Sequence, residues 1–157
     1  MYDFIFQNTT RIYFGENQLG HLTEELKKYG NRVLLTYGRG SIKKIGIYKK
    51  VINELNNGGM MVFELPDIEQ NPQHITVNRG AEICKKESID VILAVGGGST
   101  IDCSKIISAA AFYCGDSWDF ITKKAAVSKA LPLVTVLTLS ATGSEMDSGS
   151  VISNTET

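Results

Sequence analysis

The stretch VILAVGGGSTIDCSK (residues 91–105) decides the fold of this chain. A run of apolar residues typical of a buried strand ends in three glycines, and two hydroxyl residues and an acid open the next segment. Three successive glycines suit a junction where the backbone turns tightly or lets another group come very close. The N–H groups at the start of a helix lack partners inside the helix and favour an anion. The loop is therefore suited to a phosphate lying against bare backbone.

The rest of the chain repeats the alternation of strand and helix. Short apolar runs bounded by glycine predict strands, and amphipathic runs predict helices. Such an order predicts an α/β fold with a doubly wound, Rossmann-like parallel sheet and a short antiparallel lead-in at the N-terminus. The lead-in strands are expected at residues 4–6 and 11–15, the sheet strands at 31–38, 60–65, 90–98 and 131–139, and the helices at 16–30, 41–59, 71–89 and 99–113. Pro72 is expected in the first turn of the third helix, and residues 115–130 are expected to form a surface connection.

Composition narrows the class of protein. The 157 residues suffice for one domain, and 16 basic against 17 acidic residues give a net charge of -1, which does not favour a nucleic-acid partner. The three cysteines, Cys84, Cys103 and Cys114, have no CxxC spacing, which favours reduced thiols and a cytoplasmic protein. We find no signal peptide and no segment long enough to span a membrane.

Ligands of an open parallel sheet bind at the carboxyl ends of its strands. Glycine-rich or hydroxyl-rich sequence follows the strands at YGRGS (37–41), VGGGST (95–100) and LSATGSE (139–145), and EQNPQ (69–73) follows another. Ser99 is in a position to cap the following helix, with Asp102 three residues on as in a capping box. The glycine loop matches neither the GxGxxG fingerprint, because Ile101 occupies its last glycine, nor the Walker pattern.

The motifs TRIYFG (10–15), VGGGSTIDCSK (95–105) and LTLSATGSEMD (137–147) together resemble the amino-terminal half of the iron-containing (group III) alcohol dehydrogenases, and most closely their butanol dehydrogenase branch. The resemblance implies a two-domain enzyme whose first domain binds a nicotinamide dinucleotide. It also implies a helical second domain that holds iron or zinc through one aspartate and three histidines, and a small alcohol or aldehyde as substrate. This chain ends before those ligands, so residues 1–157 are expected to be the dinucleotide-binding domain alone, without catalytic or metal-binding residues.

The resemblance also assigns the candidate cofactor-binding residues. The pyrophosphate is expected on Gly97, Gly98 and Ser99, and Asp102 is expected near the nicotinamide. Asn71 is another family position near the cofactor. The nicotinamide, its ribose and the adenine region are expected along the segment after the last strand; its candidate residues are Thr138, Leu139, Ser140 and Thr142.

The loop after Gly38 predicts which dinucleotide binds. Relatives that use NAD tend to carry an aspartate after this glycine, whereas this chain has Arg39. Arg39, Ser41 and Lys44 could neutralise or hydrogen-bond a 2′-phosphate, which favours NADP over NAD.

Several alternatives stay open on sequence grounds. A cofactor domain like that of dehydroquinate synthase or glycerol-1-phosphate dehydrogenase is one, an ATP-binding phosphotransferase is another, and a non-catalytic nucleotide-binding module is a third. The two histidines, His21 and His74, lack the spacing of a metal pair and are expected to be surface or boundary residues, and Lys105 is expected to be solvated. The tail 149–153 is expected to form an unpaired edge strand, and the chain is expected to dimerise through residues 148–152.

Overall fold

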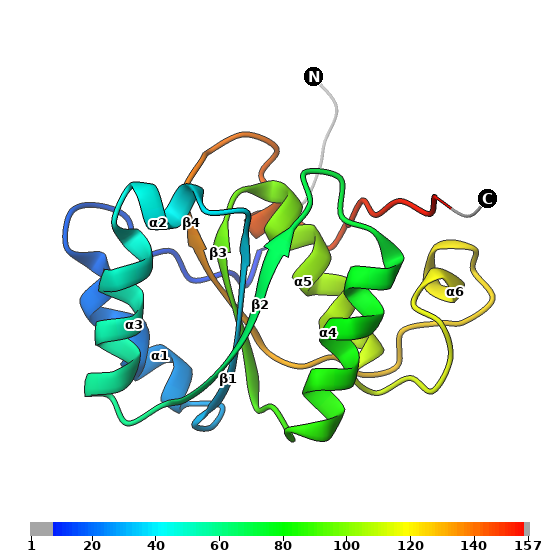
Figure 1. The fold of residues 1–157 in the computed structure, drawn as a ribbon, viewed down its shortest axis with the longest axis horizontal. Coiled ribbons are helices and arrows are strands. Elements are labelled where there is room, and N and C mark those ends of the chain that lie inside the picture. The colour runs from blue at the N-terminus through cyan, green and yellow to red at the C-terminus, as the bar shows by residue number, and fades with distance from the viewer. Residues whose placement is uncertain (1–7, 156–157) are drawn as a thin grey trace.

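The computed structural model describes residues 8–155 and has the predicted α/β fold, a four-stranded parallel sheet covered by helices on both faces (Figure 1). The strand order is β2-β1-β3-β4, so the first strand lies inside the sheet and β2 lies at one edge. The strands are β1 (Arg32–Gly38), β2 (Met61–Ile68), β3 (Val91–Gly96) and β4 (Leu133–Leu137). The helices are η1 (Gln18–His21), α1 (Leu22–Lys27), α2 (Ser41–Lys44), α3 (Ile47–Asn57), α4 (His74–Lys86), α5 (Gly98–Ala110), α6 (Trp118–Ile121) and η2 (Ser144–Met146).

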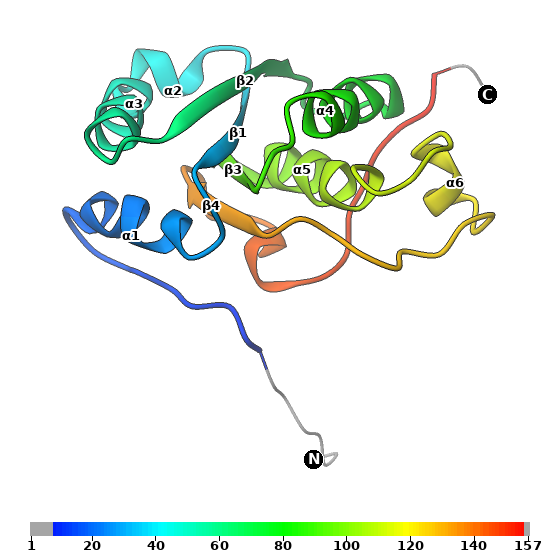
Figure 2. The same ribbon diagram turned by 90° about the horizontal axis from the view of Figure 1, so that it is seen from below.

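Alternation along β1 sends successive side chains to opposite faces of the sheet. Val33 and Leu35 pack with Leu26 and Val51 of α1 and α3, while Leu34 packs in a second core with side chains of α4 and α5. Figure 2 shows α1 and α3 on one side of the strands and α4 and α5 on the other. Because both faces are covered, β1 and β3 are apolar almost throughout, as parallel strands require.

Two predicted elements differ in the structure. The helix expected over 41–59 is divided into α2 and α3, because Gly46 has a φ of 79° and a left-handed residue cannot continue a right-handed helix. Pro72 lies just outside α4, whose first helical residue is His74, and so is not in the first turn. The connection expected over 115–130 is irregular as predicted, apart from the four residues of α6.

The predicted antiparallel lead-in is not borne out where it can be judged. Residues 4–6 lie outside the described residues, and residues 11–15 form no strand within them. Residues 11–15 are exposed and pair with no sheet strand in the described part of the chain, so no ladder fixes them as a strand.

The tail after η2 is not the open edge strand that the sequence suggested. It makes a single parallel bridge, in which the Ser153 N–H donates to the carbonyl of Pro72 at 2.8 Å and the Ser153 carbonyl accepts from the His74 N–H at 3.0 Å. Ile152 is buried in the core beside α4 and α5. The tail is therefore fastened to its own domain, and the predicted dimer contact at 148–152 loses the unpaired edge on which it rested.

Candidate functional site

At one point of the sheet, two neighbouring strands are followed by helices on opposite faces. The chain leaves β1 toward α2 and α3 on one face, and leaves β3 toward α5 on the other face, although β1 and β3 are neighbours. Such a switch point is where open α/β sheets bind their ligands. The candidate loops after β1, β3 and β4 all lie along this edge, at the top of the sheet in Figure 1.

The glycine loop forms the N-terminus of α5. Gly97 is the residue before the helix, and its carbonyl accepts hydrogen bonds from the N–H groups of Thr100 and Ile101 at 3.1 and 3.2 Å. The N–H groups of Gly98 and Ser99 have no carbonyl of a preceding helical turn to bond, which is the condition that favours an anion at a helix start. Since α5 is 13 residues long, its dipole adds to this preference.

Gly97 and Gly98 leave space that side chains would fill. A Cβ at Gly98 would come within 2.8 Å of Oγ1 of Thr142, and one at Gly97 would lie 3.8 Å from Cβ of Leu139. The loop after β4 thus lies directly beside the start of α5. Gly97 has a φ of -93°, so it does not need glycine for its backbone conformation. The absence of a side chain at Gly97 therefore leaves its backbone open to close approach by another molecule.

Ser99 does not cap α5 as predicted. The helix begins one residue earlier, at Gly98, and the Ser99 hydroxyl donates instead to the carbonyl of Gln70. This bond joins the start of α5 to the loop after β2 and brings the exposed Asn71 next to the glycine loop.

The loop after β4 is held at its first residue and exposed beyond it. The Thr138 N–H donates to the carbonyl of Gly96 at 3.0 Å, and Leu139 is 67% exposed. Ser140 and Thr142 are also exposed. An exposed apolar side chain between two hydroxyl residues provides a surface on which a flat ring could pack.

The loop after β1 carries positive charge only. Between Gly38 and Gly46 the sequence has Arg39, Lys43 and Lys44 and no acid, and Arg39 is exposed. A Cβ at Gly38 would lie 4.0 Å from Oγ1 of Thr100, so the loop starts next to α5. Ser41 and Lys44 follow in the short helix α2.

The Lys43 ammonium group lies over two tyrosine rings. Its Nζ lies 5.1 Å from the ring centre of Tyr37 and 4.8 Å from that of Tyr48. Both tyrosine hydroxyls donate to the Glu64 carboxylate, at 2.5 Å from Tyr37 and 3.1 Å from Tyr48. Lys43 is exposed like Arg39 and Lys44, but its ammonium group already lies over two rings, whereas no such contact engages Arg39 or Lys44 among the described residues.

Asp102 and Lys105 have partners that the sequence did not predict. The Asp102 carboxylate accepts from the Ser144 hydroxyl at 2.5 Å and from the Val151 N–H at 3.1 Å. Lys105, expected to be solvated, has a side chain only 14% exposed and donates to Asp147 at 2.8 Å. Its ammonium group holds the pKa of the Asp147 carboxyl below its usual value. The role of Asp102 near the nicotinamide stays a prediction.

Buried hydroxyls under the glycine loop were also missed. Thr36 in β1 and Ser104 in α5 are fully buried, and their hydroxyl oxygens lie 2.7 Å apart. Ser104 also donates to the carbonyl of Thr100 at 2.7 Å. In the sequence nothing distinguishes Thr36 and Ser104 from ordinary core residues. Only the packing of α5 against β1 brings them together.

No metal site is found among residues 8–155, where no group of three or more His, Cys, Asp and Glu side chains could hold an ion. His21 is exposed and stacks on Tyr13 with ring centres 4.6 Å apart. His74 is only 4% exposed, so the expectation of a surface or boundary residue is wrong for it. Its position at the first turn of α4, beneath the bridge to Ser153, accounts for its burial.

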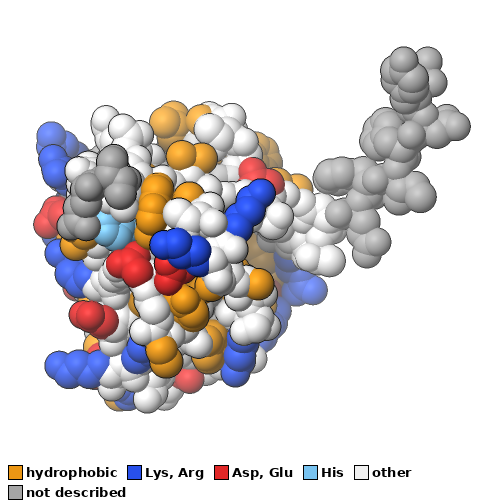
Figure 3. All heavy atoms as spheres, turned by 90° about the vertical axis from the view of Figure 1, so that its right-hand side faces the viewer, with side chains coloured by type: hydrophobic (Ala, Val, Ile, Leu, Met, Phe, Trp, Pro, Cys, Tyr) orange, Lys and Arg blue, Asp and Glu red, His pale blue; other side chains and the backbone are white. Residues whose placement is uncertain are grey.

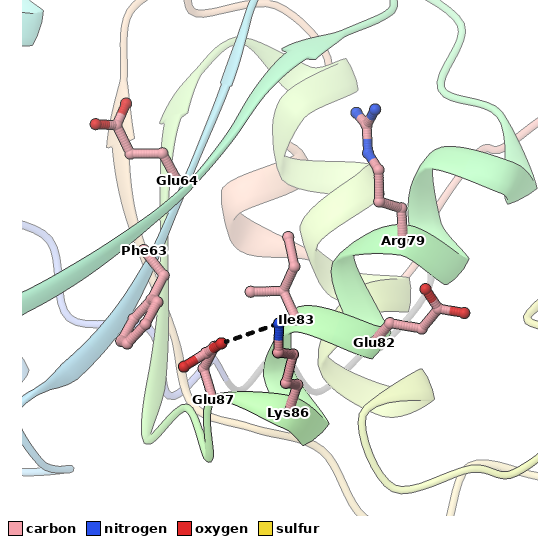
Figure 4. Close-up of a pocket in the computed structure, with 7 residues that line it drawn as sticks. All are labelled: Phe63, Glu64, Arg79, Glu82, Ile83, Lys86 and Glu87. Atoms are coloured by element: carbon pink, nitrogen blue, oxygen red, sulfur yellow. Dashed lines mark ion pairs between the residues drawn. The ribbon is translucent and has the colours of Figure 1, made fainter.

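A separate hollow of ≈ 410 Å³ lies between the edge strand β2 and α4 (Figure 4). Its lining residues are Phe63, Glu64, Arg79, Glu82, Ile83, Lys86 and Glu87. Charges of both signs line it, and Lys86 pairs with Glu87 at 3.8 Å. None of the candidate residues lines this hollow.

The surface seen from the side of α4 and α6 carries no single dominant charge. Acidic and basic side chains are interspersed with apolar ones over this face (Figure 3). In the described part of the chain, no helix is long and apolar enough to cross a membrane.

The parallel sheet, covered by helices on both faces and with a bare helix N-terminus at its switch point, defines this chain as a doubly wound, Rossmann-like α/β domain. Comparison with known proteins identifies the family: the family model for iron-containing alcohol dehydrogenases matches residues 9–157. The chain therefore belongs to the iron-containing alcohol dehydrogenase family.

The similar proteins are much longer than this chain. A probable NADH-dependent butanol dehydrogenase of Bacillus subtilis is 56% identical over 157 residues, which are all of this chain and 41% of that protein. The NADPH-dependent aldehyde reductase of Escherichia coli is 40% identical over 160 residues and is covered to 41%. The crystal structure of an NADH-dependent butanol dehydrogenase from Thermotoga maritima superposes with a TM-score of 0.94 at 42% identity, covering 99% of this chain and 39% of that one.

Proposed function

We propose that this chain is the nicotinamide-dinucleotide-binding domain of a metal-dependent alcohol dehydrogenase or aldehyde reductase that acts on small alcohols and aldehydes. The observation that carries the proposal is the bare cradle at the start of α5. Gly97 has a backbone conformation open to any residue and yet no side chain, beside N–H groups suited to a pyrophosphate. When bound, the dinucleotide takes up or supplies a hydride.

The residues of this chain would bind and orient the cofactor. Gly97, Gly98 and Ser99 would present backbone N–H groups to the pyrophosphate, and Thr138 to Thr142 would lie along the nicotinamide side. Asn71 is adjacent through the bond between Ser99 and Gln70. The residues described here include no metal ligand set, so we assign no step to a metal.

We further propose that the domain prefers NADPH to NADH. The support is the exposed Arg39 and Lys44 beside Ser41, in a loop without an acid. A guanidinium or ammonium group would form charge-assisted hydrogen bonds to a 2′-phosphate. The names of similar proteins include both cofactors, NADH for the Bacillus subtilis protein and NADPH for the Escherichia coli protein, so a direct measurement is needed.

The activity of the whole protein is not expected from this domain alone. The chain spans 41% of the Bacillus subtilis relative, and hydride transfer needs a substrate held against the nicotinamide from the other side. We therefore propose that the 157-residue chain binds dinucleotide without oxidising butanol. Metal-dependent oxidation of butanol by the pure chain would contradict this proposal.

Self-association stays part of the proposal, although not through 148–152. Phe14 is 95% exposed on the extended segment before η1, and Leu139 is also largely exposed. Exposed apolar groups favour a two-fold dimer. Light scattering over a concentration series would show a rising mass for a dimer and a constant monomer mass if this part is wrong.

Calorimetric titration of the chain with NADPH, NADH and ATP tests the main proposal. We expect saturable binding of NADPH, weaker binding of NADH and none of ATP. Equal binding of ATP would favour a general nucleotide site, and no binding of either dinucleotide would overturn the proposal.

A further inference from the structure

Two charged side chains of α5 hold the segment that follows the loop after β4. Both oxygens of Asp102 are engaged, Oδ1 by the Ser144 hydroxyl at 2.5 Å and Oδ2 by the Val151 N–H at 3.1 Å. Lys105 lies one turn further along and donates to Asp147 at 2.8 Å and to the carbonyl of Gly149 at 2.7 Å. We call these contacts of Asp102 and Lys105 the clasp.

The two α5 side chains of the clasp are mostly buried, whereas their partner Asp147 is 54% exposed. The side chains of Asp102 and Lys105 are 17% and 14% exposed. The Lys105 ammonium lies between two carboxylates, 3.9 Å from Asp102 and 2.8 Å from Asp147. Without this cation the Asp102 carboxylate would be left mostly buried and without a neighbouring positive charge, and Asp147 would lose its partner on α5.

The clasp lies at one end of the loop that borders the glycine cradle. Residues 138–143 begin at the bond from Thr138 to Gly96 and end next to Ser144, which bonds to Asp102. Between these anchors, residues 139–142 are all exposed. The position of the loop over Gly97 and Gly98 therefore depends on the anchors at its two ends. The clasp provides the second anchor, at Ser144.

We propose that Asp102 and Lys105 are positioning residues, which set the distance between the loop 138–143 and the glycine cradle and thereby the affinity for the dinucleotide. This inference rests on the proposed function. It differs from a direct role of Asp102 at the cofactor, since both carboxylate oxygens are already bonded within the protein. Asp102 and Lys105 would act through Ser144 and the exposed loop.

The test compares four variants of the 157-residue chain. Lys105→Met removes the cation, Lys105→Arg restores it, and Ser144→Ala removes only the bond that closes the loop. Lys124→Met is the matched control, because Lys124 pairs with Asp119 at 4.0 Å in an exposed contact remote from the loop in sequence. For each protein, the backbone amide NMR signals of residues 139–142 are recorded without ligand, and NADPH affinity and the free energy of unfolding are measured.

We expect Lys105→Met and Ser144→Ala to shift the amide signals of the loop and to weaken NADPH binding by about tenfold, which corresponds to about 1.4 kcal/mol. Lys105→Arg should recover the loop signals and most of the affinity, and Lys124→Met should change neither. A general loss of stability would not produce recovery by arginine together with a shift confined to the loop. If Lys105→Met fails to fold, Ser144→Ala carries the test, because it keeps every charge.

Unchanged NADPH affinity in folded Lys105→Met and Ser144→Ala would overturn the inference, even if the loop signals move. Unchanged loop signals would overturn it as well. Failure of the wild-type chain to bind NADPH would instead contradict the proposed function. In that case the ligand-free loop signals still decide whether the clasp positions the loop.

Discussion

Replacing Gly97 with valine separates a cradle for a phosphate from a simple turn. Gly97 has φ and ψ values of -93° and -169°, which a β-branched residue adopts without strain. The new Cβ would lie 3.8 Å from Cβ of Leu139, an ordinary contact distance. The folded domain should therefore accept the valine.

The magnitudes favour a selective loss of binding. Valine is a poorer residue than glycine before a helix, but it also reduces the freedom of the unfolded chain, and together these effects should change the free energy of unfolding by less than about 1 kcal/mol. Charge-assisted hydrogen bonds contribute about 1.5–3 kcal/mol each, so displacing a phosphate from the N–H groups of Gly98 and Ser99 should cost about 3–6 kcal/mol. That corresponds to a loss of NADPH affinity of about a hundredfold or more.

Fluorescence titration with NADPH, together with denaturant unfolding, measures both quantities. Gly20→Val is the matched control, because Gly20 lies in η1, outside the candidate loops, and a Cβ there meets nothing within 4 Å. NADPH affinity retained in a folded Gly97→Val protein would refute the reasoning and show that the glycines only form a turn.

Three other changes test the account at different points. Arg39→Asp should weaken NADPH binding about tenfold more than NADH binding, because a phosphate contact becomes a repulsion; equal weakening in calorimetric titrations would rule out a 2′-phosphate site. Gly80→Val should destabilise the fold by about 1–3 kcal/mol in denaturant melts, because a Cβ at Gly80 would come within 2.5 Å of Cδ1 of Ile107 where α4 crosses α5; an unchanged midpoint would contradict this packing. At pH 8 the native chain should react with a thiol reagent only at the exposed Cys114, since burial raises the pKa of both other thiols to about 12; rapid reaction of more than one thiol would contradict the buried positions.

The architecture could be predicted from the sequence because both faces of the sheet are covered. Parallel strands buried on both sides appear as apolar runs such as VILAV (91–95), and glycines mark their ends. The prediction of a strand at 11–15 was wrong. Its alternating apolar and polar residues are typical of a strand, but the pattern of one segment does not show which other strand it would pair with. Gly46 divides a helix that periodicity alone presented as continuous.

The candidate site could be predicted as a set of loops but not as a network. The strand-end rule places the residues after β1, β3 and β4 at one edge, and the contact between Gly98 and Thr142 agrees with it. Ser99 was expected to cap its helix because serine before a helix usually does, but the start one residue earlier frees its hydroxyl for Gln70. The partners of Lys105 lie more than forty positions away, at Asp147 and Gly149, and local spacing carries no sign of them.

Amide NMR spectra of the wild-type chain during titration with NADPH test the central claim most directly. The account predicts saturable shifts for the amides of Gly97, Gly98 and Ser99 at the start of α5 and for Leu139 across the cradle. NADPH that binds while these four amides stay unshifted, with shifts around Phe63 and Ile83 of the separate hollow instead, would contradict it.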